Sequence, residues 1–257
     1  MKERNALLAI HLGALLFGLS GIFGKLAATT PNMIAGGRAI FAILALGLAA
    51  LLWRSRSAVR PSLRQFALLG LGGLLLGGHW VTFFEAVKVS GVAIATLGFA
   101  SFPAFTVLLE GLLFRERTRP IEFAMVAVVC LGLILVTPEF SLASSATGGL
   151  LWAVLSGFLF ALLSLLNRAS TRGLDPVQAA LYQNITVFVC FMPLAWPLLP
   201  SVRPMDWLWL AMLGIFCTGL AHSLFVASLR VLKARTTAVI FALEPVYGIL
   251  FAWWLFS

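Results

Sequence analysis

Long apolar runs separated by short polar stretches dominate the chain. Each run is close to the ~20 residues that cross the hydrocarbon of a bilayer as a helix. Backbone polar groups in lipid must be paired within their own segment, so runs of this length predict helices. The nine predicted spans are 6–27, 33–53, 65–87, 91–114, 120–137, 148–168, 177–199, 206–230 and 236–256. The pattern therefore predicts an all-α, polytopic membrane helical bundle with the lipid bilayer as its surroundings.

The composition agrees with a membrane bundle and limits the classes of partner that the sequence predicts. Hydrophobic residues make up 61% of the 257 residues and charged residues 11%, whereas soluble domains have about 45–50% apolar and about 25% charged residues. The net charge of +9 would suit a nucleic-acid partner, but the basic residues lie in short loops, so no nucleic-acid binding is predicted. The three cysteines lie in apolar runs without metal-ligand spacing. No cofactor or metal is predicted.

The basic residues predict how the chain is oriented. With a cytoplasmic N-terminus, most Lys and Arg residues fall in cytoplasmic segments, as the positive-inside rule requires. These are Lys2, Arg4, Arg54, Arg56, Arg60, Arg64, Arg115, Arg117, Arg119, Arg168, Arg172, Arg230, Lys233 and Arg235, whereas Lys25, Lys88 and Arg203 lie on the other side.

The two halves of the chain are similar to each other. A shift of 142 positions aligns FASFPAFTVLLEGLLF (99–114) with FALEPVYGILFAWWLF (241–256) and places Pro103 on Pro245. Matching spans are five apart, and because five is odd, the two halves must be inverted relative to each other. Inverted repeats are typical of secondary transporters, whose substrate site lies near mid-membrane between the halves.

The repeat predicts two units with different numbers of helices. Residues 1–142 would form the first repeat, with spans 1–5, and residues 143–257 the second repeat, with spans 6–9. The span at 120–137 has no counterpart after Phe256. We therefore expect that the tenth helix is missing from this chain and that the sequence is truncated.

Three stretches carry a family resemblance: GGHWVTFFEAVKVSGVAIATL, FPAFTVLLEGLLFRE and LEPVYGILFAWWLF. Over nearly the whole chain the sequence resembles the EamA-like family of the drug/metabolite transporter (DMT) superfamily. The resemblance implies a ten-helix bundle of two inverted repeats that exports amino acids or related small metabolites across the cell inner membrane by alternating access. Aromatic amino acid exporters are the group that it most resembles.

Glu244 is the sharpest candidate for a functional residue. It lies about nine residues into the last span, where a carboxylate costs about 2.5–3.5 kcal/mol and normally faces a polar cavity or a partner. A structural carboxylate that joins helices is an equally good interpretation. Pro245 beside it, like Pro103 in the first half, removes a helix donor and predicts a hinge or kink.

Other polar and aromatic residues inside spans predict a substrate-binding cavity between the repeats. His79 and His222 occupy corresponding regions of two spans, and Arg38 lies deeper than a cation that snorkels to the interface. Histidines and amides in spans also serve as interhelical hydrogen-bond partners, and aromatics fill any membrane bundle. The predicted substrate-binding set is His79, Trp80, Phe83, Phe84, Phe99, Asn167, His222, Glu244 and Arg38.

The pattern as a whole favours a secondary transporter, with a small-molecule substrate such as an amino acid as its partner. A passive channel or facilitator is the alternative. An integral-membrane enzyme is less favoured, because the scattered histidines and carboxylates form no catalytic set. No Walker loop is present, so nothing in the sequence suggests ATP hydrolysis. Protons are a candidate coupling ion, and the sequence indicates neither the substrate nor the oligomeric state.

Overall fold

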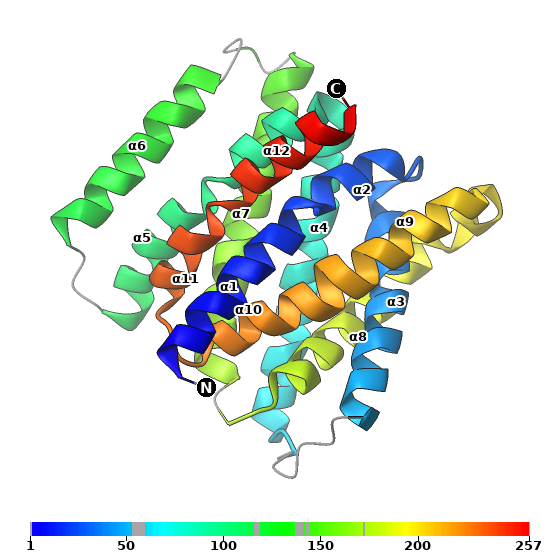
Figure 1. Ribbon diagram of the computed structural model, residues 1–257, viewed down its shortest axis with the longest axis horizontal. Coiled ribbons are helices and arrows are strands. Elements are labelled where there is room, and N and C mark those ends of the chain that lie inside the picture. The colour runs from blue at the N-terminus through cyan, green and yellow to red at the C-terminus, as the bar shows by residue number, and fades with distance from the viewer. Residues whose placement is uncertain are drawn as a thin grey trace.

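The computed structural model describes residues 2–52, 60–115, 119–136, 141, 144–171 and 173–256. Within these ranges the chain is a bundle of helices without a strand, as predicted (Figure 1). The helices are α1 (Glu3–Gly18), α2 (Ser20–Leu26), α3 (Pro31–Leu52), α4 (Leu63–Phe99), α5 (Phe102–Phe114), α6 (Pro120–Val136), α7 (Ser145–Ser170), α8 (Pro176–Ala195), the 3-10 helix η1 (Trp196–Ser201), α9 (Pro204–Gly214), the π-helix η2 (Ile215–Leu220), α10 (Ala221–Leu229), α11 (Ala234–Phe241) and α12 (Glu244–Phe256).

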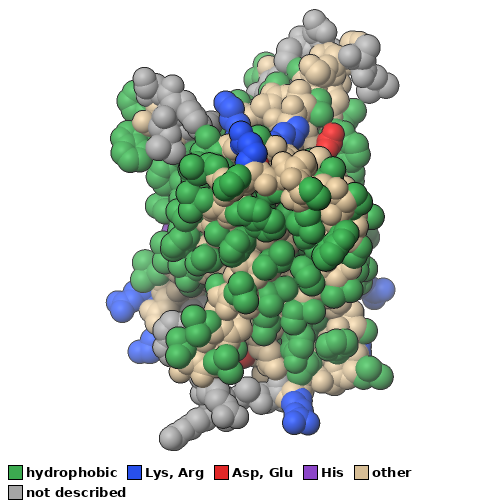
Figure 2. Space-filling model, turned by 90° about the vertical axis from the view of Figure 1, so that its right-hand side faces the viewer, with side chains coloured by type: hydrophobic (Ala, Val, Ile, Leu, Met, Phe, Trp, Pro, Cys, Tyr) green, Lys and Arg blue, Asp and Glu red, His purple; other side chains and the backbone are tan. Residues whose placement is uncertain are grey.

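Several helices are as long as a bilayer is thick, and the surface of the bundle is apolar as in a membrane protein. Six described helical segments are long and apolar enough to cross a bilayer: Glu3–Leu26, Pro31–Leu52, Leu63–Phe99, Ser145–Ser170, Pro176–Ser201 and Pro204–Leu229. Figure 2 shows a broad band of hydrophobic side chains around the middle of one face, with Lys and Arg side chains gathered toward its two ends. An apolar belt between charged ends is what a lipid environment requires.

The predicted spans at 91–114 and 236–256 are not single continuous helices. The first is divided between the end of α4 and α5, with a break at Ala100 and Ser101. The second is divided into α11 and α12, with a break at Ala242 and Leu243. Both runs are apolar overall despite Ser101 and Glu244 at the breaks, so mean hydropathy gives no sign of the breaks, which the following prolines favour.

The two breaks show the repeat in three dimensions. Phe99 ends α4 and Phe241 ends α11, and the next helices begin at Phe102 and Glu244. Each pair of positions differs by the 142 residues of the sequence repeat. Gly91, with a φ of +83° inside α4, bends the chain at the position that corresponds to Lys233, the N-cap residue of α11. These shared interruptions agree with a bundle built from two related halves.

The halves pack into each other instead of standing side by side. Helices α3 and α4 from the first half pack against α8 and α7 from the second, and α1 packs along α10. In Figure 1, α6 stands at the edge of the bundle beside α5. The broken helices α5 and α11 lie against each other, which brings both breaks to the centre of the molecule.

Candidate functional site

A small internal cavity lies where the two broken spans meet. Its volume is about 10 Å³, which is room for about one water molecule. Both halves contribute side chains to it. The lining residues are Phe17, Ser20, Arg38, His79, Trp80, Phe83, Phe99, Phe160, Phe241 and Glu244.

Arg38 provides the positive charge of the cavity. It lies on α3 and is 1% exposed. Its Nε donates a hydrogen bond to Thr218 Oγ1 at 2.9 Å and its Nη2 donates to the Cys217 carbonyl at 3.3 Å. The guanidinium carbon also lies 4.0 Å from the centroid of the Trp80 ring, a cation–π distance. These bonds use two of the five N–H donors of the guanidinium, so its plane is held while other donors remain for a ligand.

Glu244 provides the negative charge. It is the first residue of α12 and is 5% exposed, and its Oε2 atom is buried without a hydrogen-bond partner in the described part of the chain. Glu244 and Arg38 line the same cavity, yet no ion pair within 4.0 Å joins them among the described residues. Buried charges are normally paired. Two opposite charges that face one cavity without touching therefore suit a ligand that carries both signs.

Two helix N-termini add to this electrostatic environment. Helix α5 begins at Phe102 and α12 at Glu244, in each case three residues after a phenylalanine that lines the cavity. Backbone N–H groups at a helix start carry partial positive charge and favour an anionic group nearby. Broken helices that point such ends at a mid-membrane site are a known means of binding anionic groups in transporters.

His79 is held in one orientation beside the cavity. Its Nδ1 lies 2.7 Å from Ser156 Oγ, and the same hydroxyl donates to the His79 carbonyl at 3.1 Å. Because the hydroxyl has a single hydrogen, it must accept from Nδ1–H, which leaves Nε2 of a neutral ring as a hydrogen-bond acceptor. The ring also lies 4.8 Å from Phe160 and 5.1 Å from Phe99, centroid to centroid.

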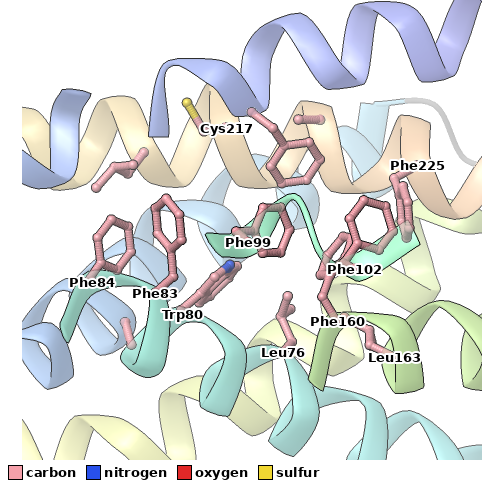
Figure 3. Close-up of a cluster of buried hydrophobic side chains, with 14 of the residues drawn as sticks. Leu76, Trp80, Phe83, Phe84, Phe99, Phe102, Phe160, Leu163, Cys217 and Phe225 are labelled. Atoms are coloured by element: carbon pink, nitrogen blue, oxygen red, sulfur yellow. The ribbon is translucent and has the colours of Figure 1, made fainter. Parts of the chain in front are cut away.

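Aromatic side chains form one wall of the cavity, and Figure 3 shows Phe99, Phe102 and Phe160 within the same cluster of buried side chains. Phe99, Phe160 and Phe241 all line it, and Phe241 lies 4.9 Å from Phe17 and 5.3 Å from Phe160 between ring centroids. Phe102 extends the cluster by stacking on Phe99 at 5.4 Å. These edge-to-face and offset contacts make the five phenylalanines a compact apolar cluster, here called the aromatic plug. The aromatic plug can contact the apolar part of a ligand.

Six of the nine predicted substrate-binding residues line this cavity, and three lie elsewhere. Asn167 and His222 belong to a separate network, in which Gln183 donates to Asn167 Oδ1 at 2.6 Å and its Oε1 lies 2.8 Å from His222 Nε2. The network joins α7, α8 and α10. These polar residues therefore serve as hydrogen-bond partners between helices, the alternative to lining a cavity. Phe84 packs against Phe83, with ring centroids 5.4 Å apart.

Phe17, Ser20, Phe160 and Phe241 line the cavity without having been predicted from the sequence. Phe241 is the repeat counterpart of Phe99, so the repeat could have indicated that it lines the cavity. The other three residues lie in ordinary apolar runs, which give no such indication. Two larger grooves, of about 360 and 380 Å³, have only apolar side chains in their linings and offer no partner for a charged group.

Comparisons with known proteins place the chain in a family. The sequence profile of the EamA-like transporter family matches residues 4–137 and again residues 147–257. An uncharacterized transporter of Bacillus subtilis, YxxF, is 23% identical over 252 residues, which is 96% of this chain and 81% of that protein. Another from the same organism, YwfM, is 25% identical over 257 residues, covering 95% of this chain and 83% of that protein.

A match over part of the chain and a match to a solved structure agree with this family. An uncharacterized transporter of Pseudomonas aeruginosa is 31% identical over 121 residues, 46% of this chain and 41% of that protein. One solved crystal structure superposes with a TM-score of 0.75 at 24% identity, covering all of this chain and 90% of the other, which shows a shared fold. With the family profile matched over nearly its full length, this multi-pass membrane chain belongs to the EamA-like transporter family.

Proposed function

We propose that this transporter exports small zwitterionic metabolites, with amino acids as the substrate class, by alternating access. The observation that carries the proposal is the pair of buried, opposite charges, Arg38 and Glu244, that line one cavity without forming an ion pair with each other. A zwitterion can satisfy both charges at once, whereas a singly charged ligand leaves one of them uncompensated in a low-dielectric site and a neutral ligand leaves both.

The chemistry of the cavity suggests how such a ligand would be oriented. Its carboxylate would accept hydrogen bonds from Arg38, near the N-termini of α5 and α12. Its ammonium group would donate to the free Oε2 of Glu244. Its side chain would then face the phenylalanine wall, which favours apolar and aromatic amino acids over strongly polar ones.

The size of the cavity argues for movement during transport. A volume of about 10 Å³ is far below the roughly 300–1,000 Å³ of ordinary ligand sites, so helices must separate to admit an amino acid. We propose Pro103 and Pro245, each in the first turn after a break, as the positions where the broken spans bend. The Glu244 carboxylate can hold either an ammonium group or a proton, so protons are the coupling ion that we propose.

A binding screen tests the substrate class. Purified protein would be heated with single amino acids and with uncharged or singly charged metabolites of similar size, and the unfolding midpoint would be measured. Ligands that bind the folded state raise this midpoint. We expect apolar and aromatic amino acids to raise it in the natural protein but not in Glu244→Gln. A shift from singly charged metabolites alone would contradict the proposal.

The channel alternative predicts a different flux. In proteoliposomes loaded with unlabelled substrate, a carrier accumulates labelled substrate by exchange, because each conformational cycle carries a molecule in each direction. A channel or facilitator with a continuous pore shows no such acceleration. We expect counterflow, together with a cytoplasmic N-terminus and an inner-membrane location as the charge pattern predicts.

A further inference from the structure

A second buried carboxylate, Glu110, lies away from the cavity, one turn before the end of α5. It is 0% exposed and belongs to the first half of the chain. Its Oε1 forms an ion pair with Arg168 at the end of α7, and its Oε2 lies 3.2 Å from Arg235 Nε. Both arginines belong to the second half, so this carboxylate joins the two halves.

Glu110 also caps the start of α11. The backbone N–H groups of Ala234 and Arg235 donate to its two carboxylate oxygens at 3.1 and 3.3 Å. The side chain of Lys233, the N-cap residue, does not cap the helix. The first N–H groups of a helix need partners, and an anion there is favoured by the helix dipole. Helix α11 is only eight residues long and depends strongly on such outside contacts.

Helix α11 connects this cluster directly to the cavity. Its first residue is held by Glu110, and its last residue, Phe241, lines the cavity and lies in the aromatic plug. Eight residues of helix span about 12 Å. Thr237 and Ala238 lie between the two ends and are buried. Helix α11 therefore links the carboxylate of Glu110 to a side chain that lines the cavity.

We propose that Glu110, Arg168 and Arg235 form the latch of a gate on the side of the membrane where the N-terminus lies. The latch is closed in this structure. When it releases, α11 swings from α5, Phe241 withdraws from the plug, and the cavity opens to that side. This inference rests on the proposed transport function, and it assigns a gating role to residues that do not touch the substrate.

Thiol labelling of α11 tests the latch without any substrate. Thr237 is 0% exposed and its hydroxyl has no hydrogen-bond partner among the described residues, so Thr237→Cys places a small thiol reporter in the buried part of α11. The native cysteines Cys130, Cys190 and Cys217 would first be replaced. A membrane-impermeant maleimide is then added from the side where an N-terminal tag is accessible.

We expect Glu110→Gln to raise the labelling rate about tenfold or more, which corresponds to a loss of about 1.4 kcal/mol from the closed state. Glu110→Asp, which keeps the charge, should give a smaller rise. Arg235→Gln removes one ion pair but keeps the backbone caps, so it should raise the rate severalfold. Glu85→Gln, the same change in α4 outside the latch, should leave the rate unchanged.

Two results would overturn the latch. One is an unchanged rate in both Glu110→Gln and Arg235→Gln, measured on protein that elutes as a single species. The other is an equal rise from both sides of the membrane, which would indicate general loosening of the fold. Neither result depends on the amino acid screen, so failure of the latch and failure of the proposed substrate can be told apart.

Discussion

Two residues place opposite charges in the membrane-spanning part of the bundle, where charged side chains are rare. A carboxylate or guanidinium in the hydrocarbon region is costly, and its retention indicates a partner or a ligand. Arg38 is oriented by Thr218 and the ring of Trp80, whereas Oε2 of Glu244 is buried without a hydrogen-bond partner among the described residues. The cost of burial is what made both residues predictable from the sequence.

Replacement of Arg38 should weaken binding of the substrate carboxylate selectively. A hydrogen bond to a charged group is worth about 1.5–3 kcal/mol, so Arg38→Gln should lower amino acid affinity by roughly 10- to 150-fold. Arg38→Lys should recover little, because an ammonium lacks the planar fork of a guanidinium. The measurement is calorimetric binding of an amino acid and of its methyl ester.

The ester provides the internal control for this prediction. It has no carboxylate, so the natural protein and Arg38→Gln should bind it with similar affinity. The exposed Arg203, replaced by Gln, serves as the matched surface variant and should leave both affinities unchanged. Equal losses for the amino acid and its ester would show that Arg38 supports the fold and does not bind the carboxylate.

Other residues at the site could not be identified from the sequence. Asn167 and His222 have the same polar character as His79, yet the structure places them in an interhelical network and His79 at the cavity. Phe160 lies in an apolar run that has many equivalent residues. Which side of a helix faces the centre depends on packing between the halves, and one chain's hydropathy contains little of that information.

Helices explain why the site has its shape. Hydropathy predicted the apolar segments, because each must be about as long as the bilayer is thick. It did not predict that two of them would break at 100–101 and 242–243, since a single Ser101 or Glu244 leaves each run apolar overall. The breaks create the helix ends beside the cavity, so this feature of the site is one that length and hydrophobicity do not reveal.

Helices α3 and α9 cross so closely at Gly214 that one added methyl group there should destabilise the protein. A Cβ at Gly214 would lie 3.0 Å from Ala42 N and would collide with the Arg38 carbonyl oxygen. Backbone atoms cannot rotate away, so Gly214→Ala should destabilise the protein by about 1–3 kcal/mol and displace Arg38. The measurement is the thermal unfolding midpoint, with amino acid binding as a second readout.

Gly47 on α3 provides the matched control. A Cβ there would meet no atom within 4 Å, and alanine favours a helix by about 0.5–1 kcal/mol over glycine. Gly47→Ala should therefore hold or raise the midpoint. If both variants unfold at the same temperature, the tight crossing of α3 and α9 does not contribute to stability.

The whole molecule combines an inverted repeat with an asymmetric latch. The repeat relates the two broken spans, but position 252, which corresponds to Glu110, is an alanine. The carboxylate contact of Glu110 is therefore not repeated at its counterpart in the second half. Transporters that alternate between two states need two closures, and these closures need not be chemically alike.

Orientation of the whole chain follows from its charges. We expect a tag at the N-terminus to be cytoplasmic, because the positive-inside rule counts Lys and Arg in short loops. Protease digestion of spheroplasts and of inverted vesicles measures this directly. The tag should be removed only in inverted vesicles. Removal in intact spheroplasts would reverse the orientation and with it the side assigned to the latch.

The central claim is that one ligand joins Arg38 and Glu244, and counterflow in proteoliposomes tests it most directly. Vesicles loaded with an apolar amino acid would be given the labelled amino acid, its amide or its deaminated acid. The account predicts rapid exchange of the zwitterion, little exchange of either analogue, and loss of the zwitterion's advantage in Arg38→Gln and in Glu244→Gln. Equal exchange of all three compounds, unchanged in both variants, would contradict it.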